Sequence, residues 1–509
     1  MAMSIGDIGL SSRMSQATLS NPPAVSAGSR QRHPIGLYTL FFTEMWERLS
    51  YYGMRALLVL FMVDTARGGM GLSDKTAASI YGLYTSAVYL AALPGGWIAD
   101  RFLGAQRAVW YGGIIIAVGH FVLAIPRAET FYAGLILVVI GTGMLKPNVS
   151  AMVGELYPEG GARRDAGFSV FYMGINLGAF IGPFICGTLG ERLNWHYGFG
   201  AAGLGMVLGL IQYRGLKRNL GAAGLRPGNA GQTSNGQKIL AFGAIVALML
   251  LVALGIARII RFDPIAMAQA TTAVLVGIAI VFFGGIFLFG RLDKIERQRV
   301  AVIVILCAVA ILFFAGLEQA GSSLNLFADR YTQRKIGFEI PTTWFQALSP
   351  IFVITLAPVM GALWVNLGRR NLNPSTPLKF GFGLILIGLG FLVLAGAAVF
   401  VARGQKVLPI WLIMTYLLHT FGELCVSPVG LSSMTKLAPK RFVGQMMGAW
   451  FLATSLGSLI AGRIAGEFDP NAVGQMPGRL LQIFILSVCV AVVIIALARP
   501  IKKMMAGVE

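Results

Sequence analysis

Charged residues are scarce in this sequence. Asp, Glu, Lys and Arg make up 12% of its 509 residues, whereas soluble domains carry about 25%. Apolar residues make up 56%, so a water-soluble fold of this length would have too little polar surface. Glycine is frequent, with 65 residues, as is common where helices pack closely in lipid. The composition predicts an all-α membrane protein that crosses the bilayer many times, and it argues against a soluble enzyme.

Cysteine and histidine are also rare, with four residues each. The cysteines lie in apolar runs without the spacing of a disulfide or a metal site, so we expect four small buried side chains: Cys186, Cys307, Cys425 and Cys489. The histidines are scattered, and no Ser/His/Asp or nucleotide-binding arrangement is present. We therefore predict no enzymatic activity, no metal and no cofactor.

Apolar segments of about 20 residues, long enough to cross about 30 Å of hydrocarbon, recur along the chain. Residues 1–32 precede them, are rich in Ser, Ala, Gly and Pro, and do not resemble a signal peptide. We predict fourteen spans, near residues 36–63, 76–99, 107–125, 130–154, 166–188, 195–213, 239–257, 267–289, 300–328, 343–366, 378–401, 408–434, 444–465 and 477–498.

The most polar stretch between spans, residues 214–238, separates the first six from the rest. Six spans also follow residue 300, which suggests two bundles with a binding site between them near mid-membrane. The predicted organisation is a disordered cytoplasmic tail (1–32), an N-terminal six-helix bundle (33–213), a cytoplasmic linker with an inserted transmembrane hairpin (214–299), a C-terminal six-helix bundle (300–500) and a cytoplasmic tail (501–509).

The positions of Lys and Arg predict the orientation in the membrane. With the N-terminal tail inside, cytoplasmic segments carry 25 of these residues and outer loops carry 13. This bias places both termini in the cytoplasm. It also accounts for the net charge of +20 without a nucleic-acid partner.

Seven charged residues cannot be assigned to a loop: Glu44, Glu47, Arg48, Arg55, Lys146, Glu318 and Glu423. Charges at membrane depth are costly and usually functional. Together with Tyr51 and Tyr52, those of the first span recur at helical spacing and form one stripe. The alternative is that the stripe only joins helices. Four carboxylates face three cations, and the surplus negative charge could be neutralised by a proton, a cation or the ammonium group of a substrate. This pattern indicates proton-coupled uptake of an amine-bearing solute.

The loop between the second and third spans reads Gly96-Trp-Ile-Ala-Asp100-Arg101-Phe-Leu-Gly104-Ala-Gln-Arg107. Asp100 could cap a neighbouring helix and pair with arginine, while the glycines allow close approach. The alternative is an ordinary basic loop.

At these residues the chain resembles the proton-dependent oligopeptide transporter family of the major facilitator superfamily. The loop at Gly96–Arg107 resembles the superfamily signature. The family's Glu-x-x-Glu-Arg pattern is similar to Glu44–Arg48, and its fifth-helix signature to Phe171–Gly178. Further matching segments are Gly143–Asn148, Glu318-Gln319 and Phe421–Pro428.

The resemblance implies a major facilitator fold of two six-helix bundles with a two-helix insertion, and a function as a proton-driven symporter of di- and tripeptides. Glu44, Glu47, Arg48 and Glu318 would couple the proton, with Lys146 as an ion-pair partner. Glu423 would bind the peptide's amino terminus, and Arg48, Lys146 and Arg55 its carboxylate. Other contacts with the substrate would come from Tyr51, Tyr52, Tyr89, Asn176, Trp344, Phe345 and Trp450. The gating residues would be Arg55, Glu318, Lys146, Glu423, Asp100 and Arg101.

Two positions depart from the family pattern. Ser349-Pro350 stands where many members have Asn-Pro, and Gly82 stands where animal members have a histidine. One rival on the same fold is a carrier of nitrate or another small anion, and another is a channel or a pump subunit. The partners we expect are a peptide, protons and the lipid bilayer, for a functional monomer in a bacterial inner membrane.

Overall fold

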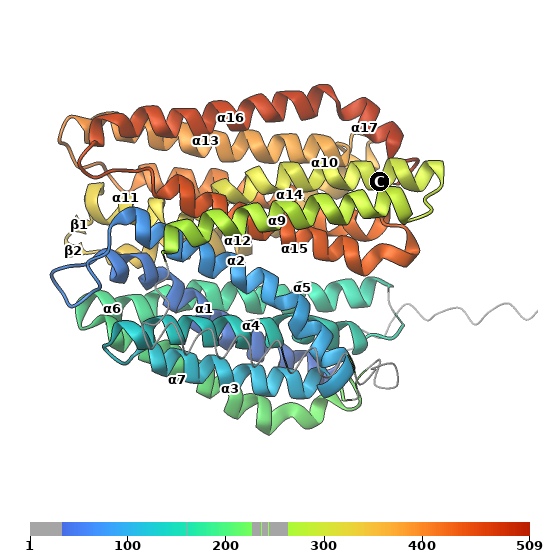
Figure 1. The fold of residues 1–509 in the computed structure, drawn as a ribbon, viewed down its shortest axis with the longest axis horizontal. Helices are drawn as coiled ribbons and strands as arrows, with labels where there is room; N and C mark the ends of the chain where they lie inside the picture. Colours follow the sequence, from blue (N-terminus) through green and yellow to red (C-terminus); the bar gives the residue numbers. More distant parts are fainter. Residues whose placement is uncertain are drawn as a thin grey trace, which may run out of the picture. The chain divides into compact units, whose positions relative to one another are not determined.

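The computed structural model describes residues 33–159, 161–225 and 263–508, together with residues 227, 236 and 243. Long helices that run side by side dominate these residues (Figure 1). The only strands there are β1 (Lys335–Ile336) and β2 (Phe338–Glu339), which form a small antiparallel hairpin.

Six spans form the first half of the described chain. They are α1 (Ile35–Val63), α2 (Asp74–Ile98), α3 (Ala105–Leu123), α4 (Ala128–Glu155), α5 (Gly161–Gly182) and α7 (Trp195–Leu216). The π-helical turn η1 (Ala99–Leu103) extends α2, and η2 (Pro183–Gly187) joins α5 to α6 (Thr188–Arg192). The 3-10 turn η3 (Lys217–Leu220) follows α7.

The second half begins with α10 (Lys294–Leu317), and α9 (Pro264–Phe289) precedes it. The other elements are η5 (Glu318–Gly321), α11 (Ser323–Tyr331), η6 (Thr342–Ala347), α12 (Leu348–Arg369), α13 (Thr376–Ala402), α14 (Ile410–Leu437), η7 (Lys440–Phe442), α15 (Val443–Ala465), η8 (Val473–Gln475), α16 (Met476–Ala496) and α17 (Ala498–Met504).

Within the described residues, thirteen of the fourteen predicted spans contain a long helix, and all but the one near 300–328 begin and end close to where expected. The span near 239–257 and the tail 1–32 lie outside the described residues. Eleven described helices are long and apolar enough to cross a membrane by composition alone. Helix α1 is not among them because Glu44, Glu47 and Arg48 interrupt its apolar sequence. The prediction of an all-α membrane protein is confirmed.

One predicted span differs in its course. The segment near 300–328 is not a single helix, because α10 ends at Leu317 and Glu318 begins the tight turn η5. The chain then continues as α11 from Ser323. The prediction missed this break because Leu324, Leu326 and Phe327 beyond it were counted with the apolar run of α10.

The cysteines also differ in part from expectation. Cys186, Cys307 and Cys425 are buried and unpaired, as predicted. The prediction was wrong for Cys489, which is exposed on α16. An apolar run in a membrane helix faces lipid as readily as protein, so hydropathy alone does not show burial.

Each half packs around its own apolar residues. In the first half, one cluster surrounds Phe61, Trp195 and Phe199, and another surrounds Met152 and Tyr213. The second half has a larger cluster, which includes Phe313, Phe380 and Trp450, and a smaller one around Met360 and Leu424. Close packing needs small residues: a Cβ added at Gly141 would lie 2.6 Å from the Gly112 carbonyl oxygen of the neighbouring helix α3.

The two halves meet along two seams. On one, α2 lies against α15, where a Cβ added at Gly462 would be 2.5 Å from the Ala78 carbonyl oxygen. On the other, α5 and η2 pack against α12 and η6. Helix α9 contacts both α2 and α15, and Leu275 packs among Leu452, Leu456 and Leu459. The inserted helix therefore lies against both halves along the first seam.

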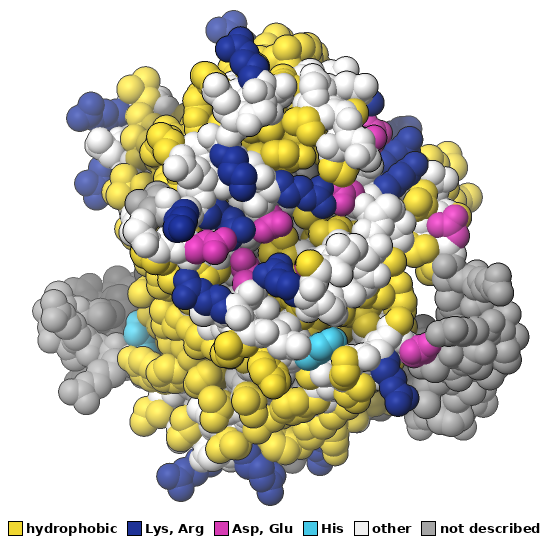
Figure 2. All heavy atoms as spheres, turned by 90° about the vertical axis from the view of Figure 1, so that its left-hand side faces the viewer, with side chains coloured by type: hydrophobic (Ala, Val, Ile, Leu, Met, Phe, Trp, Pro, Cys, Tyr) yellow, Lys and Arg dark blue, Asp and Glu magenta, His cyan; other side chains and the backbone are white. Residues whose placement is uncertain are grey.

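We call the end of these helices near Val63, Asp74 and Thr342 the distal end, because α1 reaches it last. It lies at the left of Figure 1 and faces the viewer in Figure 2, where charged side chains of both signs gather in the middle with apolar surface below them. Hydrogen bonds and ion pairs join helices α1–α7 to helices α10–α17 at this end and near the middle of α2, at Ser86 and Tyr89.

Candidate functional site

The site is centred on the charged stripe of α1. Glu44, Glu47 and Arg48 are almost fully buried, with exposed fractions of 1%, 0% and 2%. Arg48 Nε lies 3.1 Å from Glu44 Oε1 and also contacts Glu47 Oε2. Spacings of three and four residues place these side chains on one face of the helix. The sequence prediction of a single stripe is therefore confirmed by their contacts.

One guanidinium is shared by two carboxylates in this group. Neither oxygen of Glu47 accepts a hydrogen bond from the described residues. When all three groups ionise, they carry a net charge of −1 in a site sheltered from water. A proton on either carboxylate would neutralise that charge, so the group can bind and release one proton.

Lys146 extends the group from α4. Its Nζ lies 4.8 Å from the centre of the Tyr89 ring. The charges that act on it include those of Arg48, Glu47, Glu44 and Glu318. Among the described residues, no carboxylate lies within 4.0 Å of its ammonium group. The ion pair implied by the resemblance is thus not formed in this structure, and Lys146 faces an aromatic ring instead.

The second charged group joins the two halves. Arg55 Nη2 lies 2.7 Å from Glu318 Oε2, and Arg55 Nε donates to the Tyr81 hydroxyl at 2.6 Å. Tyr89 donates to the other oxygen of Glu318 at 3.2 Å. Arg55 and Glu318 are 7% and 5% exposed, so each neutralises a charge that would otherwise be buried alone.

Tyr81 was not anticipated from the sequence. It is fully buried, its hydroxyl lies against Gly321 of η5, and the Arg55 guanidinium lies 5.6 Å from its ring centre. No sequence pattern around Tyr81 distinguishes it from the other tyrosines of apolar helices. Only the contact between segments far apart in the chain shows that it orients Arg55.

Glu423 lies on α14 of the second half and is partly buried. It makes no hydrogen bond or ion pair with any described residue, so its carboxylate is free to bind a cation. Its charge acts on the phenols of Tyr52 and Tyr172. Asn176 lies one turn beyond Tyr172 on α5 and donates to its carbonyl at 2.9 Å.

The aromatic residues differ in their surroundings. Tyr51 lies against Arg48, whose Cζ is 5.2 Å from its ring centre, and Tyr52 lies against Arg55. Trp344 donates to the Thr188 hydroxyl at 2.9 Å. Phe345 and Trp450 are buried in the apolar cluster of the second half. These two side chains pack against protein, and their predicted contact with substrate stays a prediction.

Asp100 and Arg101 lie in η1, beyond the end of α2 that is opposite to the distal end. The Arg101 guanidinium lies 5.3 Å from the Trp97 ring centre, and Asp100 is exposed. Gly104 ends this turn with a φ of 76°, a value that glycine adopts without strain. The structure therefore separates this pair from the central site. Of the described residues, no three His, Cys, Asp or Glu side chains lie close enough to hold a metal ion.

Comparison with known proteins adds independent findings. The sequence model described as POT family matches residues 106–475. A peptide transporter of Yersinia enterocolitica, YePEPT, is 43% identical over 93% of this chain and 95% of its own. A di-/tripeptide transporter of Lactococcus lactis is 37% identical over 94% of this chain and 97% of its own. The crystal structure of a peptide transporter POT in complex with sulfate superposes with a TM-score of 0.86 at 39% identity, over 94% of this chain and 97% of that one.

Proposed function

The chain belongs to the POT family of membrane transporters, and we propose that it imports di- and tripeptides driven by the inward proton gradient. As a member of that family it is a transport protein and not an enzyme. The relatives named peptide or di-/tripeptide transporters support the substrate class.

The distribution of charge between the halves is the observation that supports a peptide best. Arg48 and Lys146 supply positive charge from the first half, and the free carboxylate of Glu423 supplies negative charge from the second. A peptide has a carboxylate at one end and an ammonium group at the other. A small inorganic anion would leave Glu423 without a partner, and a like charge near it would be repelled.

We assign the roles as follows. Glu44, Glu47 and Arg48 bind the transported proton, because two carboxylates share one guanidinium and one of them can be protonated. Arg48 and Lys146 attract the peptide carboxylate, Glu423 the amino terminus, and Tyr51, Tyr52, Tyr89, Asn176 and Trp450 line the substrate path. Arg55 and Glu318 hold the distal end closed, with proton binding to Glu318 as the step that releases Arg55.

We place the distal end outside the cell, with both termini in the cytoplasm of a bacterial inner membrane. The excess of Lys and Arg in the opposite loops supports this orientation. The polar contacts that join the halves at the distal end support a state closed to the outside. Residues 33–213 and 300–500 would be the two bundles that rock about the site, in a transporter that works as a monomer.

The test is uptake of a peptide panel by proteoliposomes, with and without an inward proton gradient. We expect dialanine and trialanine to accumulate only with the gradient, and excess dialanine, but not nitrate, to compete. Competition by nitrate with no effect of dialanine would instead establish the anion carrier.

A further inference from the structure

We propose that Glu191 is a second gating residue, which holds the distal end closed by capping the helix that begins at Thr342 in the other half of the molecule. The proposal rests on the proposed transport function, since a gate needs a transport cycle. It concerns contacts separate from the pair of Arg55 and Glu318.

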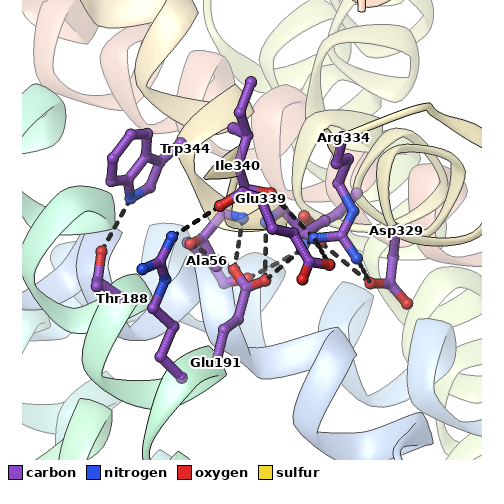
Figure 3. A network of polar contacts seen from close by, with 12 residues as sticks. Ala56, Thr188, Glu191, Asp329, Arg334, Glu339, Ile340 and Trp344 are labelled. Atoms are coloured by element: carbon purple, nitrogen blue, oxygen red, sulfur yellow. Dashed lines mark hydrogen bonds and ion pairs between the residues drawn. The ribbon is translucent and has the colours of Figure 1, made fainter. Parts of the chain in front are cut away.

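The carboxylate of Glu191 accepts three hydrogen bonds from η6 (Figure 3). Thr342 N donates to Oε2 at 2.8 Å, Thr343 N donates to Oε1 at 2.8 Å, and Thr343 Oγ1 donates to Oε1 at 2.7 Å. The Glu191 side chain is only 6% exposed. Glu191 belongs to α6 of the first half, whereas both threonines are the first residues of η6 in the other half.

A carboxylate is well suited to this position. The first N–H groups of a helix have no acceptor within it, and the aligned peptide dipoles make that end partly positive. Here η6 and α12 run on as one helix of 28 residues, Thr342–Arg369. Hydrogen bonds to an ionised acceptor are also stronger than neutral ones. Glu191 therefore does from the other half what a capping residue normally does from within the same helix.

The neighbours of Glu191 fit the same contact. Gly187 lies so close to Thr343 that a Cβ there would overlap the Thr343 hydroxyl. Trp344 donates to Thr188 at 2.9 Å, and Arg192 donates to the Glu339 carbonyl at 2.7 Å. The segment Gly187–Arg192 thus docks along the start of η6, with Glu191 as its only carboxylate.

The contact does not depend chiefly on an ion pair. Arg334 Nη1 is 4.0 Å from Glu191 Oε2. The same guanidinium is closer to Asp329, at 3.2 Å, and to the Ile340 carbonyl, at 2.9 Å. Arg334 mainly orders its own half, as Figure 3 shows, and the donors from η6 hold Glu191.

The two gates differ in what can release them. Glu318 also contacts Tyr89, next to Lys146, and so lies beside the central site. In the described part of the chain, the hydrogen bonds and the ion pair of Glu191 reach none of the central residues. Its cap therefore sets the ratio of closed to open distal ends in the absence of substrate, whereas the Arg55 gate responds to the site.

The test is a distance measurement between spin labels across the distal end. Labels are placed at Ala128→Cys and Gln405→Cys, both exposed, with the exposed Cys489 replaced by serine. The protein is studied in lipid nanodiscs by double electron–electron resonance without peptide. The variants are Glu191→Ala and the isosteric Glu191→Gln. The matched control is Glu339→Ala, which removes a carboxylate of the same region that is 68% exposed and 3.5 Å from Arg334.

We expect Glu191→Ala to raise the ratio of open to closed distal ends by about tenfold or more, since a charged acceptor is lost from three donors. Glu191→Gln should give a smaller shift in the same direction, because one amide oxygen replaces two carboxylate oxygens. Glu339→Ala should change the ratio less than twofold, because exposed ion pairs contribute little.

Two results would overturn the proposal. The first is an unchanged distance distribution for both Glu191 variants. The second is an equal shift for Glu339→Ala, which would show a general effect of surface charge. If Glu191→Ala does not fold, Glu191→Gln decides alone. A failure of peptide uptake by the wild-type protein would be seen separately in proteoliposomes and leaves the distance result interpretable.

Discussion

One guanidinium between two carboxylates is the side-chain arrangement on which the proposed proton coupling depends. Arg48 can fully neutralise only one of Glu44 and Glu47, and all three groups are buried. Burying an unpaired charge costs several kcal/mol, so when Lys146 is engaged by a peptide carboxylate, Glu44 and Glu47 favour taking up a proton. Because neither carboxylate is open to solvent, a proton is the cation small enough to bind there and neutralise the charge.

The first prediction concerns Glu47. Glu47→Gln should abolish gradient-driven accumulation of dialanine, because an amide can neither bind nor release the proton. Exchange of labelled for unlabelled peptide at equal concentrations should persist, since that process needs no net proton movement. Both are measured in the same proteoliposomes. Gradient-driven accumulation at the wild-type level would remove Glu47 from the coupling mechanism.

The second prediction concerns Glu423, which has no partner among the described residues. A charge-assisted contact with the peptide ammonium should stabilise the complex by about 1.5–3 kcal/mol. Glu423→Gln should therefore weaken binding of free-amine peptides by about tenfold or more, measured by competition. N-acetylated peptides serve as the control, because they lack the ammonium group. Equal losses for both ligand classes would mean that Glu423 is structural.

The third prediction concerns Asp64, in the loop after α1. Its carboxylate accepts hydrogen bonds from the Trp195 indole at 2.9 Å and from the backbone of Arg67 at 2.9 Å. Burial alone would raise the pKa of Asp64, but these bonds and the Arg67 guanidinium outweigh it and lower the pKa below its ordinary value. The folded state therefore binds this proton less readily than the unfolded state. The stabilisation is present above the ordinary pKa of about 3.9 and is lost as the pH falls through the lower folded value.

Asp64→Asn should accordingly lower the melting temperature at pH 6, and the difference from wild type should shrink as the pH falls towards about 3. Thermal unfolding in nanodiscs across this range measures it. Glu467→Gln is the control, because its carboxylate is 50% exposed and its ion pair with Arg479 should contribute little. A difference that does not vary with pH would mean that the charge of Asp64 has no part in the effect.

At the scale of helices, the pair of Arg55 and Glu318 links α1 to the turn that ends α10. In the proposed cycle this ion pair is a latch that has to open each time, so its net strength must be modest. Tyr81 and Tyr89 orient the two charges, one from each side. If the two charges were exchanged between these positions, the tyrosines would no longer orient them correctly, so only part of the function should return.

The fourth prediction follows. Arg55→Glu and Glu318→Arg should each abolish transport, because each leaves two like charges buried together. The double variant should restore part of the lost uptake, because opposite charges again face each other. Uptake by the double variant no better than that of the worse single variant would indicate that the pair is a bystander. Normal transport by both single variants would show that no latch exists there.

The sequence predicts the helices well and their contacts poorly. Hydropathy places α13 and α15 within two residues at each end, because a bilayer requires a long apolar run. Helical spacing also places Glu44, Glu47 and Arg48 together, since all three lie on one helix. The break at Glu318 is not visible, because a change from an α-helix to a 3-10 turn leaves the composition unchanged.

Contacts between distant segments are the part that sequence patterns do not reveal. Tyr81 meets Arg55 across 26 positions, and Glu191 meets Thr342 across 151. Glu191 lies between predicted spans and was therefore not among the seven membrane charges. Arg330 pairs with Asp74 at 2.5 and 2.8 Å, again between the halves. The role proposed for the Glu191 carboxylate depends on N–H donors from the other half, which only the folded structure brings next to it.

For the molecule as a whole, the halves carry complementary tasks. The first half contributes Glu44, Glu47 and the cations, and the second contributes Glu423 and Glu318. The contacts that join them are concentrated at the distal end, at Arg55, Asp74 and Glu191. Helix α9 lies against both halves at the seam of α2 and α15. An alternating-access cycle would break the distal contacts while the charges of the centre hold the substrate.

The most direct test of the account is whether peptide entry carries protons. The protein is reconstituted in liposomes that contain a pH-sensitive dye, with equal pH on both sides and valinomycin with potassium to balance charge. We predict that dialanine added outside acidifies the interior, whereas N-acetyl-dialanine does not, and that Glu47→Gln abolishes the acidification. Entry of labelled dialanine through the wild-type protein with no change in internal pH would contradict proton-coupled transport.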